Sequence, residues 1–375
     1  MTDCSRRQLI CGLAGLAAEM SVAGAQRRPR LRVTTVLNGR ASVPLVTLPT
    51  EWLYLDPDGA RREPLATETA VYVPLRSGKV VALVQRDGAR LWETAPGVAT
   101  TGALARLGER LIACATRPVA DGVTGPVGIV RFLDAATGVV RREIELPSPI
   151  TSPLVGDGVR LYARLGTTEA AAFRPDDFSL LWQVTGDFTE HLTCDGDGVL
   201  VGTRSGALWR LRAADGGRQW GCTLGGAPGP ATGDAEQVYC GTAQGEVVAI
   251  RRADGRIRWR RRVGGTVAAP PLIDRERVLI ASYDNFLYAF AGRTGVMLWR
   301  QQMAGRLATP PVRLTEDSVA VAALDDDEIT IVSSVDGRII ARRRLASERV
   351  FSALHLAGGL VIAATERGVV AAKLL

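Results

Sequence analysis

The sequence predicts an all-β fold, an eight-bladed β-propeller of four-stranded antiparallel blades that is closed by pairing of the N- and C-terminal segments. Three observations lead to this prediction. A strand–turn–strand pattern recurs eight times, a tryptophan or a substitute for it recurs about every 40 residues, and the final repeat lacks one strand. A period of this length with several short strands per unit is typical of a propeller.

The repeated hairpin is clearest at residues 238–250, VYCGTAQGEVVAI, where two runs of β-forming residues flank a turn at Gln244-Gly245. So small a unit cannot bury its own apolar face, and it needs neighbours of the same kind. The other seven copies begin at Val71, Leu111, Leu161, Val199, Val278, Val319 and Leu360.

The third strand of each repeat is marked by a residue four positions after a turn glycine, as in Gly255 and Trp259. The seven marker positions are 38 to 50 residues apart, which sets the length of one blade. The tryptophans at this marker are Trp92, Trp182, Trp220, Trp259 and Trp299.

Three repeats depart from the marker pattern. Arg142 and Ala341 occupy the tryptophan position, and Phe178 occupies the glycine position before Trp182. The longest step between markers contains an insertion around residues 118–127, which is predicted to form a loop.

A fourth strand is predicted before most hairpins, because prolines stand a short distance upstream and proline is confined to strand starts and edges. These are Pro64, Pro153, Pro230, Pro270 and Pro310. The eighth hairpin, residues 360–373, has no third strand after it. Residues 41–55 have the composition of a strand and are predicted to complete this last blade, which removes its exposed edges.

The N-terminal residues are predicted to be a targeting segment. Residues 1–25 contain Ser5-Arg6-Arg7-Gln8-Leu9-Ile10, which resembles the twin-arginine export motif, and Ala23-Gly24-Ala25, which offers a cleavage site. Residues 26–42 are interpreted as a basic, flexible linker, and residues 43–375 as one propeller domain. We therefore expect an exported protein, periplasmic or otherwise associated with the cell envelope, with no transmembrane segment. A lipid anchor is not expected, because no cysteine follows the apolar run.

The six cysteines follow no metal-binding spacing. Cys4 and Cys11 lie in the leader, and Cys114 and Cys240, at or next to matching positions of their hairpins, are interpreted as buried small thiols. Cys194 and Cys222 would pair only if the geometry of the blade permits it.

The charged residues and histidines indicate no catalytic or metal site. The chain carries a net charge of +7, but aromatic residues are too few, at 5%, for a stacking surface that binds nucleic acid. Clustered arginines at residues 256–262 and 342–344 are interpreted as solvated outer-strand faces, and Asp325-Asp326-Asp327-Glu328 as a solvated turn in preference to a calcium site. His191 and His355 lie at non-equivalent places. A catalytic site assembled from several blades would leave no local spacing to read.

The pattern VYxGTxxGxxxAL…DGxxxW, clearest at residues 199–220, 238–259 and 278–299, resembles the PQQ-like β-propeller repeat, a WD40-like architecture. The resemblance implies that Trp92, Trp182, Trp220, Trp259 and Trp299 are structural girdle residues that pack between blades. Quinoprotein dehydrogenases of this family use adjacent cysteines, a tryptophan platform and a calcium site, whereas this chain has no Cys-Cys pair. The size of the chain is closer to that of the non-catalytic, BamB-like branch.

The favoured hypothesis is therefore an exported, non-catalytic scaffold that binds a protein or peptide through one rim, as a monomer and without a cofactor. Two alternatives stay open. One is a PQQ-dependent quinoprotein oxidoreductase with calcium. The other is a propeller that senses or binds a ligand or polymer, or a hydrolase with a dispersed site.

Overall fold

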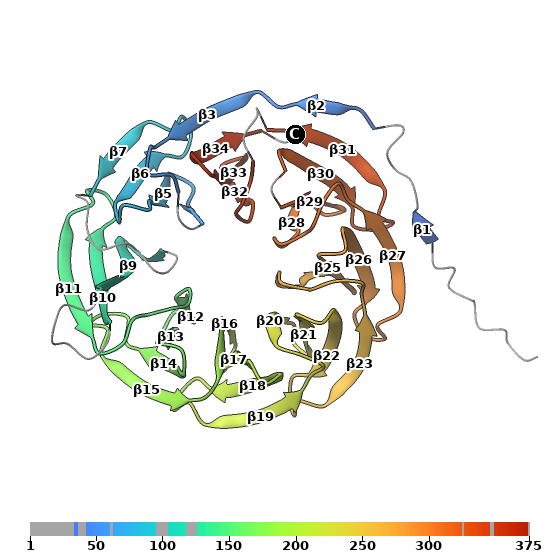
Figure 1. Cartoon of the computed structure of the whole chain (residues 1–375), viewed down its shortest axis with the longest axis horizontal. Helices are drawn as coiled ribbons and strands as arrows, with labels where there is room; N and C mark the ends of the chain where they lie inside the picture. The colour runs from blue at the N-terminus through green and yellow to red at the C-terminus, as the bar shows by residue number, and fades with distance from the viewer. Residues whose placement is uncertain are drawn as a thin grey trace, which may run out of the picture. The chain divides into compact units, whose positions relative to one another are not determined.

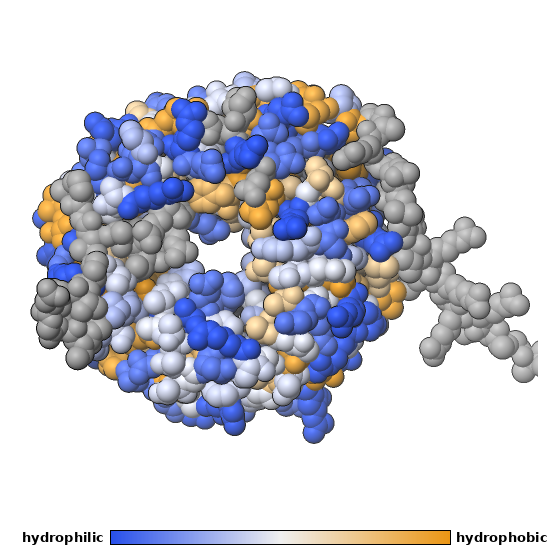
Figure 2. Space-filling view, viewed as in Figure 1, coloured by the Kyte–Doolittle hydropathy of each residue, from blue (hydrophilic) through white to orange (hydrophobic). Residues whose placement is uncertain are grey.

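The computed structural model describes residues 34–36, 43–60, 63–94, 104–117, 126–324, 326–345 and 349–373. All regular secondary structure in these residues is β-strand, and the strands form eight sheets that surround a central channel (Figures 1 and 2). The predicted eight-bladed propeller is confirmed. No helix among the described residues is long and apolar enough to cross a membrane.

Each of the first four blades is a four-stranded antiparallel sheet in sequence order. Blade 1 contains β4 (Leu65–Ala66), β5 (Ala70–Pro74), β6 (Val80–Val84) and β7 (Arg90–Glu93). Blade 2 contains β8 (Ala105–Leu107), β9 (Arg110–Arg117), β10 (Val127–Asp134) and β11 (Val140–Leu146). Blade 3 contains β12 (Val155–Gly156), β13 (Leu161–Leu165), β14 (Glu169–Phe173) and β15 (Leu180–Thr185). Blade 4 contains β16 (Phe188–Asp195), β17 (Gly198–Thr203), β18 (Ala207–Arg212) and β19 (Arg218–Thr223).

The remaining blades repeat this order, and the last three also contain strands from the N-terminal segment. Blade 5 contains β20 (Pro228–Gly233), β21 (Gln237–Thr242), β22 (Glu246–Arg251) and β23 (Ile257–Arg262). Blade 6 contains β24 (Leu272–Asp274), β25 (Arg277–Ala281), β26 (Phe286–Ala291) and β27 (Met297–Gln302). Blade 7 contains β28 (Val312–Thr315), β29 (Ser318–Ala322), β30 (Glu328–Ser333) and β31 (Ile339–Arg344). Blade 8 contains β32 (His355–Ala357), β33 (Leu360–Thr365), β34 (Gly368–Ala372) and β3 (Thr50–Leu55).

The two ends of the chain meet in blade 8. β3 pairs with β34 in antiparallel register, with Trp52 opposite Ala371 and Tyr54 opposite Val369. This pairing confirms that part of residues 41–55 supplies the missing strand of the last blade. The closing strand is also fixed to blade 1, because Trp52 Nε1 donates a hydrogen bond of 2.8 Å to the backbone oxygen of Gln85.

The N-terminal segment does more than close the ring. β2 (Leu45–Thr47) pairs in parallel with β31 of blade 7, and β1 (Thr34–Val36) pairs in parallel with β27 of blade 6. The segment therefore follows the outside of three consecutive blades (Figure 1). Only the second half of residues 41–55 pairs with the last hairpin, and the stretch expected to be a linker, residues 26–42, contains a strand. Backbone groups on an outer edge gain hydrogen-bond partners in this way.

The apolar core is divided among the junctions between blades. Eight clusters of buried side chains each combine residues from two neighbouring blades. The cluster between blades 8 and 1, for example, contains Trp52, Val71 and Ile362. Because every junction has such a cluster, the ring is closed by side-chain packing as well as by backbone pairing.

The five tryptophans named by the family resemblance are buried, and each lies at the junction with the next blade. Each indole N–H donates a hydrogen bond to the backbone oxygen of the residue that directly follows the third strand of the next blade, which is β10, β18, β22, β26 or β30. This bond satisfies the polar end of a buried ring. The acceptors of Trp92, Trp182, Trp220, Trp259 and Trp299 are Ala135, Ala213, Arg252, Gly292 and Ser334, at 3.1, 2.9, 2.8, 2.7 and 3.3 Å. Trp52 makes the same contact for blade 8, where no marker tryptophan was predicted.

The cysteines in the described residues are free thiols. Cys114 and Cys240 are buried, as predicted. Cys194 and Cys222 do not pair, because they lie on the first and fourth strands of blade 4 with two strands between them. Strands in a sheet are about 4.8 Å apart, so this separation exceeds the Cα distance of about 7 Å that a disulfide can bridge. Cys4 and Cys11 lie outside the described residues.

Candidate binding site at the channel

One face of the propeller, which we call the channel face, is built from two kinds of segment. The residues that lead into the first strand of a blade lie against the turn between its second and third strands. In blade 3 the backbone N–H of Gly166 donates to the oxygen of Pro149 at 2.8 Å, and in blade 4 that of Arg204 donates to Asp187 at 2.8 Å. Because the contact recurs from blade to blade, the fold holds these segments in place around the channel.

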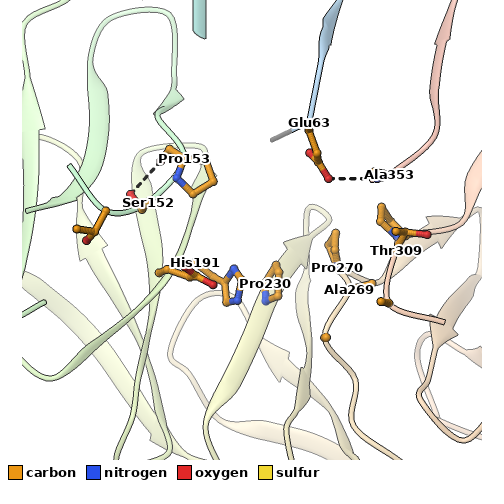
Figure 3. Close-up of a pocket in the computed structure, with 14 residues that line it drawn as sticks. Glu63, Ser152, Pro153, His191, Pro230, Ala269, Pro270, Thr309 and Ala353 are labelled. Atoms are coloured by element: carbon orange, nitrogen blue, oxygen red, sulfur yellow. Dashed lines mark hydrogen bonds between the residues drawn. The ribbon is translucent and has the colours of Figure 1, made fainter. Parts of the chain in front are cut away.

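A cavity of about 370 Å³ lies on this face, and we call it the channel cavity. Seven blades contribute to it through residues at or just before their first strands (Figure 3). Four blades place a proline at the equivalent position, which gives a rigid, apolar wall that lacks backbone donors. The other three blades place Glu63, His191 or Ala353 there. The prolines are Pro153, Pro230, Pro270 and Pro310.

The channel cavity has three ionisable side chains, Glu63 of blade 1 and Glu190 and His191 of blade 4. Glu63 accepts a hydrogen bond of 3.3 Å from the backbone N–H of Ala353 (Figure 3). Burial lowers the pKa of His191, and nearby Arg164 lowers it further against the opposing effect of Glu190. His191 is therefore neutral at pH 7 and offers one donor and one acceptor.

A second cavity, also about 370 Å³, opens beside the first and shares Glu190, His191 and Ala268 with it. We call it the arginine cavity, because Arg164 and Arg204 line it. Burial lowers the pKa of Arg164, and the charge of Arg204 lowers it further, so the two guanidinium groups repel each other. Both stay charged, since an arginine does not lose its proton in proteins.

Arg164 is held in one orientation by the leading segments of blades 3 and 4. Its Nε donates to Thr151 Oγ1 at 3.0 Å, and its Nη1 donates to the backbone oxygen of Phe188 at 3.0 Å. Thr151 in turn donates to the backbone oxygen of Gly166. The backbone N–H of Arg164 donates to Ser152 Oγ at 2.8 Å. The side chain is thus preorganised at the edge of the cavity.

The position of Arg164 in its blade is otherwise occupied by small residues or proline. It precedes the residue that bridges back to the leading segment, as Pro74 does in blade 1 and Ala364 in blade 8. The matching residues of blades 4 to 7 are Gly202, Gly241, Ala281 and Ala322. A buried arginine is therefore a specific feature of blade 3 and not a consequence of the repeat.

The acidic run of blade 7 differs from the solvated turn that the sequence suggested. Glu328 is the first residue of β30 and is buried, and it accepts two hydrogen bonds from Arg342, at 2.5 and 2.6 Å. Asp327 lies 3.3 Å from Arg344, and Asp325 is outside the described residues. The acids and arginines of this blade neutralise one another. Within the described ranges, no group of three histidine, cysteine or acidic side chains could hold a metal ion.

The residues around the channel do not fit the quinone cofactor that gives the repeat its name. The wall of the channel cavity consists of prolines and small side chains, with Glu63 and Glu190 as its acids. The tryptophans that a quinone platform would need are instead buried at the blade junctions, with their indole N–H groups bonded to backbone. The donor set therefore supports binding through hydrogen bonds and charge.

The fold and this channel define a closed eight-bladed propeller with a tryptophan at most of its junctions. Residues 126–229 and 223–373 match the family model described as outer membrane protein assembly factor BamB. The match extends over more than half of the chain, which therefore belongs to this family of PQQ-like β-propellers. No curated protein matches the chain in sequence.

Three solved structures illustrate the shared fold. BamB from Moraxella catarrhalis superposes with a TM-score of 0.70 at 19% identity, over 87% of this chain and 99% of that one. The computationally designed Ika8 protein gives a TM-score of 0.70 at 15% identity, over 88% and 100%. The C-terminal WD40 domain of Sif2 gives 0.66 at 12% identity, over 88% and 99%. At these identities the likeness shows the fold alone.

Proposed function

We propose that this protein is an exported, non-catalytic scaffold that binds a partner protein or peptide at the channel face. The observation that supports this most directly is the pair of adjacent cavities, because their walls are preformed. Prolines and backbone hydrogen bonds fix the channel cavity, and a network around Arg164 fixes the arginine cavity. A rigid surface loses little conformational entropy when it binds.

The family supports the same proposal. The matching model describes an assembly factor, and a protein of that kind acts by binding other proteins. All eight blades are completed within one chain, which supports a monomer as the binding unit. A small ligand is the second candidate, because a volume of about 370 Å³ falls within the range of ligand pockets.

The test of channel-face binding uses a photo-crosslinking amino acid introduced at position 308 on the channel face. The matched control carries it at position 136, an exposed turn residue of blade 2 on the opposite face. We expect a discrete protein adduct in the envelope fraction from position 308 alone. We also expect it to disappear in an Ala268→Trp background, because Ala268 lines both cavities and a bulky ring there obstructs them. Equal adducts from both positions, or an adduct that survives Ala268→Trp, would contradict the proposal.

Export is the second part of the proposal, and it rests on the sequence of residues 1–25, which lie outside the described residues. We expect removal of the leader after Ala25 and dependence on the twin-arginine route. Replacing Arg6-Arg7 with Lys-Lys should leave the protein in the cytoplasm, as measured by fractionation and N-terminal sequencing. Unchanged export of this variant, or an intact Met1 on the exported protein, would show that the leader has another role.

A further inference from the structure

Within the described residues, neither guanidinium group of the arginine cavity forms an ion pair, although the charge of Glu190 acts on Arg164 from further away. No carboxylate oxygen of the described residues lies within 4.0 Å of either group. Arginines elsewhere in the ring do reach one, among them Arg131, Arg210, Arg260 and Arg342. Arg164 is 7% exposed and uses two of its five N–H donors on Thr151 and Phe188. Arg204 is exposed, and its side chain forms no hydrogen bond with any residue that the structure describes.

A buried guanidinium without an ion pair is costly, and proteins usually provide one. Here the charged guanidinium of Arg164 instead lies at a cavity wall, which also contains a hydroxyl group that is free to form hydrogen bonds. Thr189 Oγ1 is buried, lines the same cavity and has no hydrogen-bond partner. Three groups that could donate to one anion, from Arg164, Arg204 and Thr189, thus lie around one space.

We propose that the arginine cavity binds a carboxylate, carried by an acidic side chain of an extended segment of the partner. The inference rests on the proposed function, since it specifies the chemistry of what docks at the channel face. Arg164 supplies a planar, fixed fork that suits a carboxylate. Arg204 reaches the same space from the turn of the next blade, and Thr189 donates its hydroxyl.

The net charge of the cavity favours a carboxylate over a phosphate. Glu190 also lines it and offsets one of the two arginine charges, and His191 is neutral. A single positive charge complements a monoanion, whereas a phosphate group carries about −1.5 to −2 at pH 7. The source is a peptide because the channel cavity lies beside this one, with Glu190, His191 and Ala268 lining both, so the flanking residues of an extended chain have room on the same face.

The experiment titrates the full-length protein with two blocked pentapeptides, Gly-Ser-Glu-Ser-Gly and Gly-Ser-Gln-Ser-Gly, and measures binding by calorimetry or by NMR. We expect the glutamate peptide to bind at least about 10-fold more tightly, the value of one charge-assisted hydrogen bond. Binding should weaken as salt is raised. Equal affinity of the two peptides, or no binding of the glutamate peptide up to about 10 mM, overturns the proposal.

Single substitutions test whether the preference for the glutamate peptide arises in the arginine cavity. Arg204→Met, at an exposed site that does not threaten folding, and Arg164→Met should each weaken the glutamate peptide about 10-fold and leave the glutamine peptide unchanged. Glu190→Gln should strengthen it, because it removes the competing negative charge. Arg256→Met, at an outer arginine of blade 5, is the matched control and should change nothing. Unchanged affinity in Arg204→Met, or weaker binding in Glu190→Gln, contradicts the assignment.

Acetate and inorganic phosphate separate the possible sources of the anion. Acetate should bind at least about 10-fold more weakly than the glutamate peptide, because it lacks the flanking chain. Acetate that binds as well as the peptide, or phosphate that binds more tightly, overturns the peptide carboxylate. In either case the position 308 adduct would still report on channel-face docking, so the failure of this inference and the failure of the proposed function are distinguishable.

Discussion

Gly295 of blade 6 lies directly against the indole ring of Trp259 of blade 5. A β-carbon on Gly295 would come 2.5 Å from Cδ2 of Trp259, and the φ angle of Gly295 is +66°. The same indole donates its N–H to Gly292, three residues earlier. The same contact occurs at the other five junctions where a tryptophan precedes, so the repeated glycine and tryptophan form contacts between blades as well as a turn within one.

Gly295→Ala is expected to destabilise the fold through this contact. The matched control is Gly108→Ala, because Gly108 has a φ of +59° but nothing within 4 Å of its added β-carbon. Both variants bear the left-handed backbone cost of about 1 kcal/mol, and only Gly295→Ala also bears the overlap, about 1–3 kcal/mol more. Denaturant unfolding measures the difference. Equal losses of stability would show that the ring contact contributes nothing.

Trp259→Ala should cost about 3–5 kcal/mol of unfolding free energy, the range for a large aromatic residue removed from a core. Trp259 is 6% exposed and packs near Tyr239 and Phe290, with ring centroids 6.1 Å away in both cases. Trp209, a half-buried tryptophan on β18, is the control, and Trp209→Ala should cost less than half as much. A loss below about 1 kcal/mol at Trp259 would mean that the junction does not depend on it.

The junction between blades 2 and 3 is packed without a tryptophan. Arg142 stands at the tryptophan position of blade 2 and is exposed. Phe178 stands at the glycine position of blade 3 with a φ of +57° and is 2% exposed. Its ring stacks on Phe173 at 4.4 Å and meets Phe132 edge-on at 6.1 Å. Phe178 of blade 3 therefore fills the space that, at a regular junction, is filled by a tryptophan of the preceding blade.

A double replacement tests this exchange. Phe178→Gly should lose about 2–4 kcal/mol, because the cavity outweighs the relief of backbone strain. Arg142→Trp alone should also be destabilising, because Phe178 occupies the space that the new ring requires. The double variant should recover to within about 1 kcal/mol of the natural protein, measured as a double-mutant cycle. Additive losses would contradict the idea that the two residues replace each other.

The repeat period predicted the fold because each blade reproduces the same local pattern. A hairpin, a glycine and a tryptophan recur at fixed spacing, and each of them has the same contact in every regular blade. The sequence did not reveal the role of Trp52, because its blade is assembled from both ends of the chain and Leu48 stands where four of the five marker tryptophans have a preceding glycine. It indicated strand character for residues 45–47, which form β2. It did not indicate β1, or that β1 and β2 pair with outer strands remote in sequence.

The binding site could not be predicted in the same way. Glu63, Arg164, His191 and Arg204 come from blades 1, 3, 4 and 4, and no fixed spacing relates them. Of these residues, only Arg164 could have been singled out from the sequence. An arginine there, at a position of Gly, Ala or Pro in six other blades, is visible once the hairpins are aligned. Its significance depends on the cavity beside it, which is a property of the closed ring.

The thiols provide a test of burial that depends on pH. Burial raises the pKa of Cys194 and Cys222 to about 11 and that of Cys114 to about 12. The folded chain from residue 26 onward should therefore react slowly with a thiol reagent at pH 8, and all thiols should react in denaturant. Because the folded pKa values are raised, these groups lower stability as pH rises from about 9 towards 11. Rapid labelling of Cys114 in the native protein would contradict its burial.

Ring closure is tested by shortening the chain from its N-terminus. Deleting residues 1–40 removes β1, a strand added to the outside of a complete blade, and should leave a folded protein. Deleting residues 1–49 also removes β2 and exposes the edge of β31, which should lower stability but keep cooperative unfolding. Both deletions retain β3 and its hydrogen bond from Trp52 to Gln85.

Deleting residues 1–56 removes β3 itself, and we expect this deletion, unlike the two shorter ones, to abolish folding. Blade 8 would then keep β32, β33 and β34 only, with the edge of β34 unpaired and the apolar cluster between blades 8 and 1 deprived of Trp52. An unpaired apolar edge is a template for aggregation, so this fragment should be insoluble or lack cooperative unfolding. Solubility, calorimetry and near-UV circular dichroism of the three fragments measure the outcome. A soluble fragment of residues 57–375 that unfolds cooperatively would show that the ring does not need its closing strand.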